Sequence, residues 1–249
     1  REDKFGRFAW TVMSRTLSYA AGLIPEIADD IVTVDIAMKL GFNWHYGPFE
    51  LLDRIDTAWF VNRLRSENRP IPPLLEFGAP LYKTETGQLL FSDLSAHYHP
   101  VPRDPGILLL SDIKRQGPPL LTNASASLWD IGEGVACLEF HSKMNTLNME
   151  TMTLIRQSID KICQEFTALV IYNEAEHFSA GANLNLLMGA LAEQDWPAIE
   201  DFIRQGQQTY QALKYAPFPV VGAATGLALG GGCEILLHCD AIQAHAELY

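Results

Sequence analysis

Two glycine-rich segments, each preceded by a short apolar run, constrain the fold of this chain more than any other feature. Residues 177–183 (HFSAGAN) follow the apolar run 168–172 (ALVIY). Residues 226–234 (GLALGGGCE) follow the apolar run 218–224 (FPVVGAA). Each glycine-rich segment leads into a predicted helix, and the repeated order of strand, turn and helix predicts an α/β domain with a parallel sheet. Ligands of such domains bind at the carboxyl ends of the strands, so both segments are candidate binding turns.

These turns place backbone amides at the starts of two helices. Two N–H groups that point at one spot form an oxyanion hole, which stabilises negative charge on a carbonyl oxygen. Gly231 has no side chain, so a ligand can approach its backbone closely. Glu234 follows three residues later, and we expect it beside the same spot. An apolar surrounding for this glutamate is predicted by its neighbours Leu227, Leu229, Ile235 and Leu236.

The chain divides into three regions by composition. Residues 1–70 are predicted to be helical, with one helix that starts at Pro25 and is capped at Gly41. A second helix runs from Phe49 to Leu64, and the absence of a glycine-rich phosphate loop after a strand excludes a dinucleotide-binding domain here. Residues 71–124 are rich in proline and glycine, which predicts a linker with short ordered segments.

Residues 125–249 form the third region. A hairpin is predicted from residues 126–131 and 135–140 around a Gly-Glu-Gly turn. Asn148 is predicted to cap a helix, and Trp196-Pro197 to open another. Alternation of strands and helices then continues to the last residue.

Composition limits the partners of the chain. The net charge is −12, which argues against nucleic acid bound through a broad basic face. No apolar run is long enough to span a bilayer, and no secretory core follows the first residues, so we expect a cytoplasmic protein. The four cysteines form no CxxC pair and are interpreted as reduced thiols, and His97 and His99 as surface loop residues; no metal site is predicted.

Residues 125–249 resemble the first half of a crotonase domain, the enoyl-CoA hydratase/isomerase type. The matching motifs are residues 143–147 (KMNTL), 177–182 (HFSAGA), 226–234 (GLALGGGCE) and 239–240 (CD). Residues 5–67 resemble the helical C-terminal domain of 3-hydroxyacyl-CoA dehydrogenases through residues 35–42 (DIAMKLGF) and 47–53 (GPFELLD). The order of the two regions is similar to bifunctional fatty-acid β-oxidation proteins with a C-terminal hydratase. The resemblance implies a helical domain, the linker, and then a truncated crotonase βα spiral.

The resemblance also implies roles for particular residues. The backbone N–H groups of Ala182 and Gly231 would bind the carbonyl oxygen of an acyl-CoA thioester, and Glu234 would act as an acid/base on water. Coenzyme A would be held by Lys143, Met144, Asn145, Ala180 and Gly181. The family's second catalytic glutamate would follow Tyr249. Asn183 departs from the aspartate of many relatives, which puts a charged side chain there in doubt but not the backbone chemistry.

The implied function is hydration of 2-enoyl-CoA and oxidation of the 3-hydroxy product with NAD. NAD would be bound by a domain upstream of Arg1, and we expect the 249-residue chain alone to have negligible hydratase activity. A crotonase-type isomerase or thioester hydrolase remains an alternative, because the same hole serves these reactions. Another is a non-catalytic docking or scaffold segment between domains. A homo-oligomer is compatible with each of these hypotheses.

Overall fold

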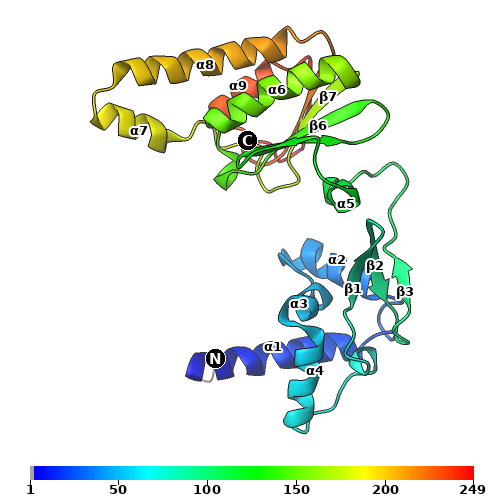
Figure 1. Cartoon of the computed structure of the whole chain (residues 1–249). Coiled ribbons are helices and arrows are strands. Elements are labelled where there is room, and N and C mark those ends of the chain that lie inside the picture. Colours follow the sequence, from blue (N-terminus) through cyan, green and yellow to red (C-terminus); the bar gives the residue numbers. More distant parts are fainter. Residues whose placement is uncertain (1–2) are drawn as a thin grey trace. The chain divides into compact units, whose positions relative to one another are not determined.

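The computed structural model describes residues 3–249 and divides the chain into two compact units, Arg1–Ile107 and Leu108–Tyr249 (Figure 1). The boundary falls inside the predicted linker 71–124, so the structure divides the chain differently from the sequence-based prediction. Residues 71–107 belong to the first unit, and residues 108–124 to the second. Each unit has its own apolar core.

The first unit begins with four helices: α1 (Lys4–Gly22), α2 (Ile31–Phe42), α3 (Pro48–Ile55) and α4 (Thr57–Ser66). The predicted start of a helix at Pro25 is wrong, because the Asp30 side chain accepts a hydrogen bond from the Thr33 N–H at 2.7 Å and caps α2. Gly41 lies inside α2, whose C-terminal cap is Asn43 in a left-handed conformation. The predicted single helix over residues 49–64 is divided at Asp56, which caps α4.

A buried carboxylate joins α2 to α3 in this unit. Asp35 accepts hydrogen bonds from the N–H groups of Phe49 and Glu50, at 2.9 and 3.1 Å, and from the Tyr82 hydroxyl at 2.8 Å. Desolvation by burial outweighs these bonds and raises the pKa of Asp35 to about 6. Asp35 therefore caps α3 from a distance and connects it to the sheet that follows.

That sheet has three antiparallel strands, β1 (Tyr82–Glu85), β2 (Gln88–Ser92) and β3 (Tyr98–Pro100), preceded by the 3₁₀ turn η1 (Pro73–Leu75). Its apolar side chains complete the core of the helices, with Leu81 and Val101 buried and Phe91 packed against them. The Asp53 carboxylate of α3 accepts from the Leu81 and Tyr82 N–H groups at 2.8 and 2.6 Å. Residues 71–107 are therefore part of a folded unit, because their apolar side chains find a core between the breaks made by proline.

The second unit contains a six-stranded sheet in the order β4–β5–β6–β7–β8–β9. Its strands are β4 (Leu121–Thr122), β5 (Ala126–Asp130), β6 (Val135–Phe140), β7 (Ala168–Tyr172), β8 (Val220–Ala224) and β9 (Ala241–Ala244). The first three strands are antiparallel, and β6 to β9 are parallel. The predicted hairpin and the predicted α/β class with a parallel sheet are confirmed.

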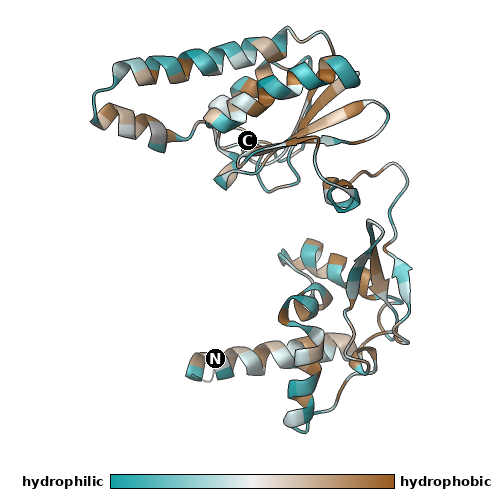
Figure 2. Cartoon of the chain, viewed as in Figure 1, coloured by the Kyte–Doolittle hydropathy of each residue, from teal (hydrophilic) through white to brown (hydrophobic). Residues whose placement is uncertain are grey.

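Helices cover both faces of this sheet (Figure 1). The helices are α5 (Leu110–Gln116), α6 (Met149–Glu165), α7 (Leu184–Ala192), α8 (Trp196–Lys214) and α9 (Gly231–Leu237). α6, α8 and α9 supply buried side chains to the main core, and Figure 2 shows hydrophilic residues along the outer parts of α6 and α8. Asn148 caps α6 as predicted, and the helix α8 opens at Trp196.

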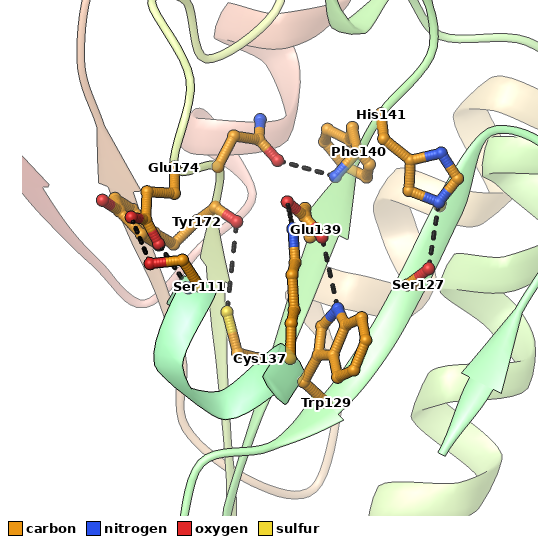
Figure 3. Close-up of polar contacts among 12 residues, drawn as sticks. Ser111, Ser127, Trp129, Cys137, Glu139, Phe140, His141, Tyr172 and Glu174 are labelled. Atoms are coloured by element: carbon orange, nitrogen blue, oxygen red, sulfur yellow. Dashed lines mark hydrogen bonds and ion pairs between the residues drawn. The ribbon is translucent and has the colours of Figure 1, made fainter. Parts of the chain in front are cut away.

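α5 packs on the opposite face of the sheet, where alternate side chains of β5 and β6 point. The Ser111 N–H and hydroxyl donate to the Glu174 carboxylate at 2.6 and 2.9 Å (Figure 3). Lys114 pairs with the buried Glu139, which also accepts from the Trp129 ring N–H at 3.2 Å. These polar contacts fix α5 beside the end of β7, from which the first glycine-rich turn departs.

Candidate functional site

The two glycine-rich turns lie side by side because they follow neighbouring parallel strands. The first leads from β7 to α7, and the second from β8 to α9. The Ser179 N–H donates to the Leu227 carbonyl at 2.9 Å, and the Leu229 N–H donates to the Ser179 carbonyl at 2.9 Å. Together with a parallel bridge between Ser179 and Ala228, these bonds extend the pairing of β7 and β8 into the turns.

Two glycines permit this close pairing. Gly181 has φ +90°, and a Cβ there would lie 2.8 Å from the Leu229 carbonyl oxygen. Gly226 has φ +61°, and a Cβ there would lie 2.0 Å from the Glu176 carbonyl oxygen. In both cases the obstacle is backbone, which cannot rotate away. The positions of the turns are thus set by residues that have no side chain.

A third segment joins the turns. It is the 3₁₀ turn η2 (Lys143–Asn145) together with Leu147, between β6 and α6. The Ala180 N–H donates to the Met144 carbonyl at 3.1 Å, and the Leu147 N–H donates to the Gly181 carbonyl at 2.8 Å. The residues predicted to hold coenzyme A, Lys143 to Asn145 with Ala180 and Gly181, therefore lie together, and the side chains of Lys143 and Met144 are exposed.

Buried polar side chains hold these three segments in register. The Asn145 amide donates to the His177 carbonyl at 2.8 Å, and the Ser179 hydroxyl donates to the Asn145 carbonyl at 2.7 Å. Asn173 accepts from the Phe140 N–H at 2.6 Å and donates to the Phe178 carbonyl at 2.6 Å. Sequence reasoning missed the roles of Asn173 and Ser179; an amide side chain directly after a buried strand was the one available signal.

Ala182 and Gly231 adjoin at one point, where both line the same cavity. The Gly181 C=O and the Asn183 N–H, on either side of Ala182, both bond Leu147. In an extended segment successive groups point to opposite sides, so the Ala182 N–H points away from Leu147. A Cβ placed on Gly231 would lie 3.7 Å from the Ala182 nitrogen. Within residues 3–249 neither N–H has a protein acceptor. Two neighbouring donors without partners are what an oxyanion hole requires.

This point opens into a cavity of about 260 Å³. α6, α7 and α8 supply most of its walls. The lining residues are Leu147, Met152, Ala182, Leu187, Phe202, Ile203, Gly206, Gln207, Tyr210, Gly231 and Glu234. The wall is mainly apolar, as in sites for small organic ligands.

Glu234, on α9, is the one carboxylate that lines this cavity among the described residues. The predicted apolar surrounding is wrong, because the Glu234 side chain is exposed while Ile235 and Leu236 point into the core. α9 places these residues on different faces of one turn. The carboxylate therefore meets solvent at the edge of the cavity and remains within the same site as the two amides.

Asn183 caps α7, with its side-chain oxygen accepting from the Asn185 N–H at 3.1 Å. All four cysteines are free thiols. No group of three or more His, Cys, Asp or Glu residues in the described chain is placed to bind a metal ion. Over the same residues, no helix is both long enough and apolar enough to cross a membrane.

Comparisons with known proteins agree with this geometry. Residues 130–247 match the enoyl-CoA hydratase/isomerase family. The chain is 35% identical to a Bacillus subtilis protein named as a probable 3-hydroxyacyl-CoA dehydrogenase, over 100% of this chain and 32% of that protein. It is 30% identical to a Rickettsia prowazekii protein named as a fatty acid oxidation complex trifunctional enzyme, over 98% of this chain and 32% of that protein. The chain thus spans about a third of the length of these curated relatives.

A solved structure of an enoyl-CoA hydratase from Bacillus anthracis is 24% identical, with a TM-score of 0.44. The similarity covers 50% of this chain and 48% of that one.

Proposed function

We propose, because residues 130–247 match the enoyl-CoA hydratase/isomerase family, that this chain is part of a longer fatty-acid β-oxidation enzyme that hydrates 2-enoyl-CoA. The observation that carries this proposal is the pair of unpartnered N–H groups, Ala182 and Gly231, in the lining of an apolar cavity that also contains a carboxylate. Such a cavity suits an acyl chain, and such a pair of donors suits the oxygen of its thioester.

Hydration of an enoyl thioester passes through an enolate-like state with negative charge on the thioester oxygen. In our proposal the Ala182 and Gly231 N–H groups donate to that oxygen, and their bonds strengthen as the charge develops. Removing one donor of this kind costs about 3 kcal/mol of transition-state stabilisation. The backbone pairing between the turns holds both donors in place before the substrate arrives.

Glu234 is assigned the transfer of a proton between water and the substrate. Its carboxylate lies at the solvent edge of the cavity, where water enters. No other carboxylate lines the cavity in residues 3–249, and the second acid/base is assigned to a part of the longer enzyme outside this chain. We therefore expect the chain alone to turn over enoyl-CoA far more slowly than the longer enzyme.

Coenzyme A is assigned to the surface formed by η2 and the first turn, where Lys143 offers an exposed cation to phosphate. We assign no NAD-binding role to the residues of this chain. Within residues 3–107 the first unit consists of helices and an antiparallel sheet, without the parallel βαβ element that binds a dinucleotide. The oxidation step is assigned to another part of the longer enzyme, and the cytoplasmic location and a homo-oligomeric state stay predictions.

The test measures the loss of the absorbance of the conjugated enoyl thioester when the longer enzyme hydrates crotonyl-CoA. We expect Glu234→Gln to lower kcat by a hundredfold or more, on the order of the contribution of a general acid/base. Glu133→Gln, in the exposed hairpin turn between β5 and β6, is the matched control and should leave kcat unchanged. Undiminished hydration by Glu234→Gln would show that this carboxylate is not the acid/base.

An isomerase is the second candidate, because the matched family description names both activities. Isomerisation moves a proton between two carbons and needs no added water. A 3-enoyl-CoA substrate separates the candidates: an isomerase converts it to the conjugated isomer and raises the absorbance, whereas a hydratase leaves it unchanged.

A further inference from the structure

Tyr210 brings a side chain to the point where Ala182 and Gly231 adjoin. It lies on α8, and its ring is buried in the main core, 5.5 Å from the ring of His238. Its hydroxyl oxygen lies 2.9 Å from the position that a Cβ on Gly231 would occupy. The Ala182 nitrogen lies 3.7 Å from that same position. The hydroxyl therefore lies beside the two amides, and all three residues line the cavity.

This hydroxyl has no hydrogen-bond partner among the residues that the structure describes, although its ring is buried. Two other tyrosine hydroxyls of the chain are partnered. Tyr82 donates to Asp35 at 2.8 Å, and Tyr98 donates to the Pro80 carbonyl at 2.6 Å. The hydroxyl oxygen is not among the buried polar atoms that lack a partner, and Tyr210 lines the cavity, so the oxygen is open to it. The hydroxyl is therefore free to donate to an acceptor that enters the cavity.

The protonation state of the Tyr210 hydroxyl is the one that a hydrogen-bond donor needs. Burial, with the negative charge of Glu234 as a smaller cause, raises the pKa of Tyr210 to about 12. The phenol therefore keeps its proton at neutral pH. α8 packs against α6 and α9, and the Tyr210 ring is buried in the main core, so the hydroxyl has little freedom to turn to another acceptor.

We propose that Tyr210 is a third hydrogen-bond donor to the thioester oxygen, beside the N–H groups of Ala182 and Gly231. The proposal rests on the function proposed above, since the acceptor is the oxygen of a bound acyl-CoA. It makes Tyr210 a catalytic residue, because the phenol touches the atom on which charge develops.

The experiment uses the longer enzyme and cinnamoyl-CoA, a thioester whose conjugated chromophore moves to longer wavelength when its carbonyl is polarised. Tyr210→Phe removes only the hydroxyl, and Tyr215→Phe is the matched control because Tyr215 follows the same helix and is 78% exposed. We expect the wild type and Tyr215→Phe to give the same red shift on binding, and Tyr210→Phe to give a smaller one. The kcat for crotonyl-CoA should fall about tenfold to a hundredfold in Tyr210→Phe, with KM within about threefold.

Melting temperatures check the fold, and Tyr210→Phe should match the wild type because the lost hydroxyl bonds no protein atom. A full red shift with unchanged kcat in Tyr210→Phe would overturn the proposal. A full red shift with lowered kcat would also overturn it, since the hydroxyl would then act on water or on Glu234. If the wild type neither shifts the chromophore nor hydrates crotonyl-CoA, the proposed function itself fails and the role of Tyr210 fails with it. Hydration by the wild type separates these cases.

Discussion

Gly231→Ala is the substitution that most directly tests the oxyanion hole. The added Cβ would lie 2.9 Å from the Leu147 side chain and 2.9 Å from the Tyr210 hydroxyl, closer than ordinary carbon contacts. The Leu147 methyl group is the end of a flexible side chain and can move, whereas the Tyr210 ring is buried and must shift by a few tenths of an ångström. Overpacking of this kind destabilises a protein by about 1–3 kcal/mol. The variant should therefore remain folded but be less stable than the wild type.

The effect on chemistry should be larger. An oxygen that accepts from the Ala182 N–H would lie about 2.9 Å from that nitrogen, and the new methyl group stands 3.7 Å from it. We therefore expect the methyl group to crowd the thioester oxygen. Loss of one oxyanion donor lowers kcat by roughly 10²–10³, equal to about 3–4 kcal/mol. We expect kcat for crotonyl-CoA to fall by at least this factor in the longer enzyme.

Gly189→Ala provides the matched control. Gly189 lies within α7, in the helix that follows the first turn, and a Cβ there would meet no atom within 4 Å. Replacing a helical glycine by alanine should stabilise the protein by about 0.5–1 kcal/mol and leave kcat unchanged. The measurements are the initial rate of hydration and the free energy of unfolding. A folded Gly231→Ala enzyme with kcat within about threefold of the wild type would refute an oxyanion hole at this position.

Three further predictions concern the chain itself. Since burial raises the pKa of Asp35 from 3.8 to about 6, the folded state holds this proton more tightly than the unfolded state. The free energy of unfolding of the first unit should therefore fall by up to about 3 kcal/mol as the pH rises from about 4 to 6. Asp35→Asn should remove this pH dependence, which hydrogen exchange measured at increasing denaturant concentration would show. Asn173→Ala leaves a buried N–H and a buried C=O without partners and should lower the free energy of unfolding by about 2 kcal/mol or more in urea; a loss under about 0.5 kcal/mol would contradict the role given to it. Iodoacetamide should label the exposed Cys163 and Cys233 well before Cys137, whose pKa burial raises to about 12, as peptide mass spectrometry would show.

The second unit could be predicted from the sequence because its signals are local. Asn148 bonds the Thr151 N–H three residues later, and the positive φ of Gly181 and Gly226 marks turns at the ends of two apolar runs. These features depend on neighbours in the chain. The pairing of β7 with β8 then follows from the general preference of parallel strands for adjacent, helix-connected neighbours.

The first unit was harder to predict for a physical reason. Proline and glycine interrupt residues 71–107, so β1, β2 and β3 are too short to show a clear alternation. What makes them a sheet is the core offered by helices far away in sequence, into which Leu81 and Val101 insert. The start of α2 was misplaced because Pro25 resembles a first-turn residue, whereas the Asp30 carboxylate supplies the actual cap.

The candidate site also contains residues that local sequence signals predict and one residue that they do not. Its predicted residues lie on segments that contact one another, because the donors are backbone groups and the glycines that position them are visible in the sequence. Tyr210 could not be found in this way, since α8 carries no motif and its ring reaches the site only through packing against α6 and α9. A hole built from main chain tolerates many side chains around it, so the identity of those side chains is free to set the reaction. The specificity of this site should therefore depend on Tyr210 and Glu234, and Gly231 should determine only whether an oxyanion is bound at all.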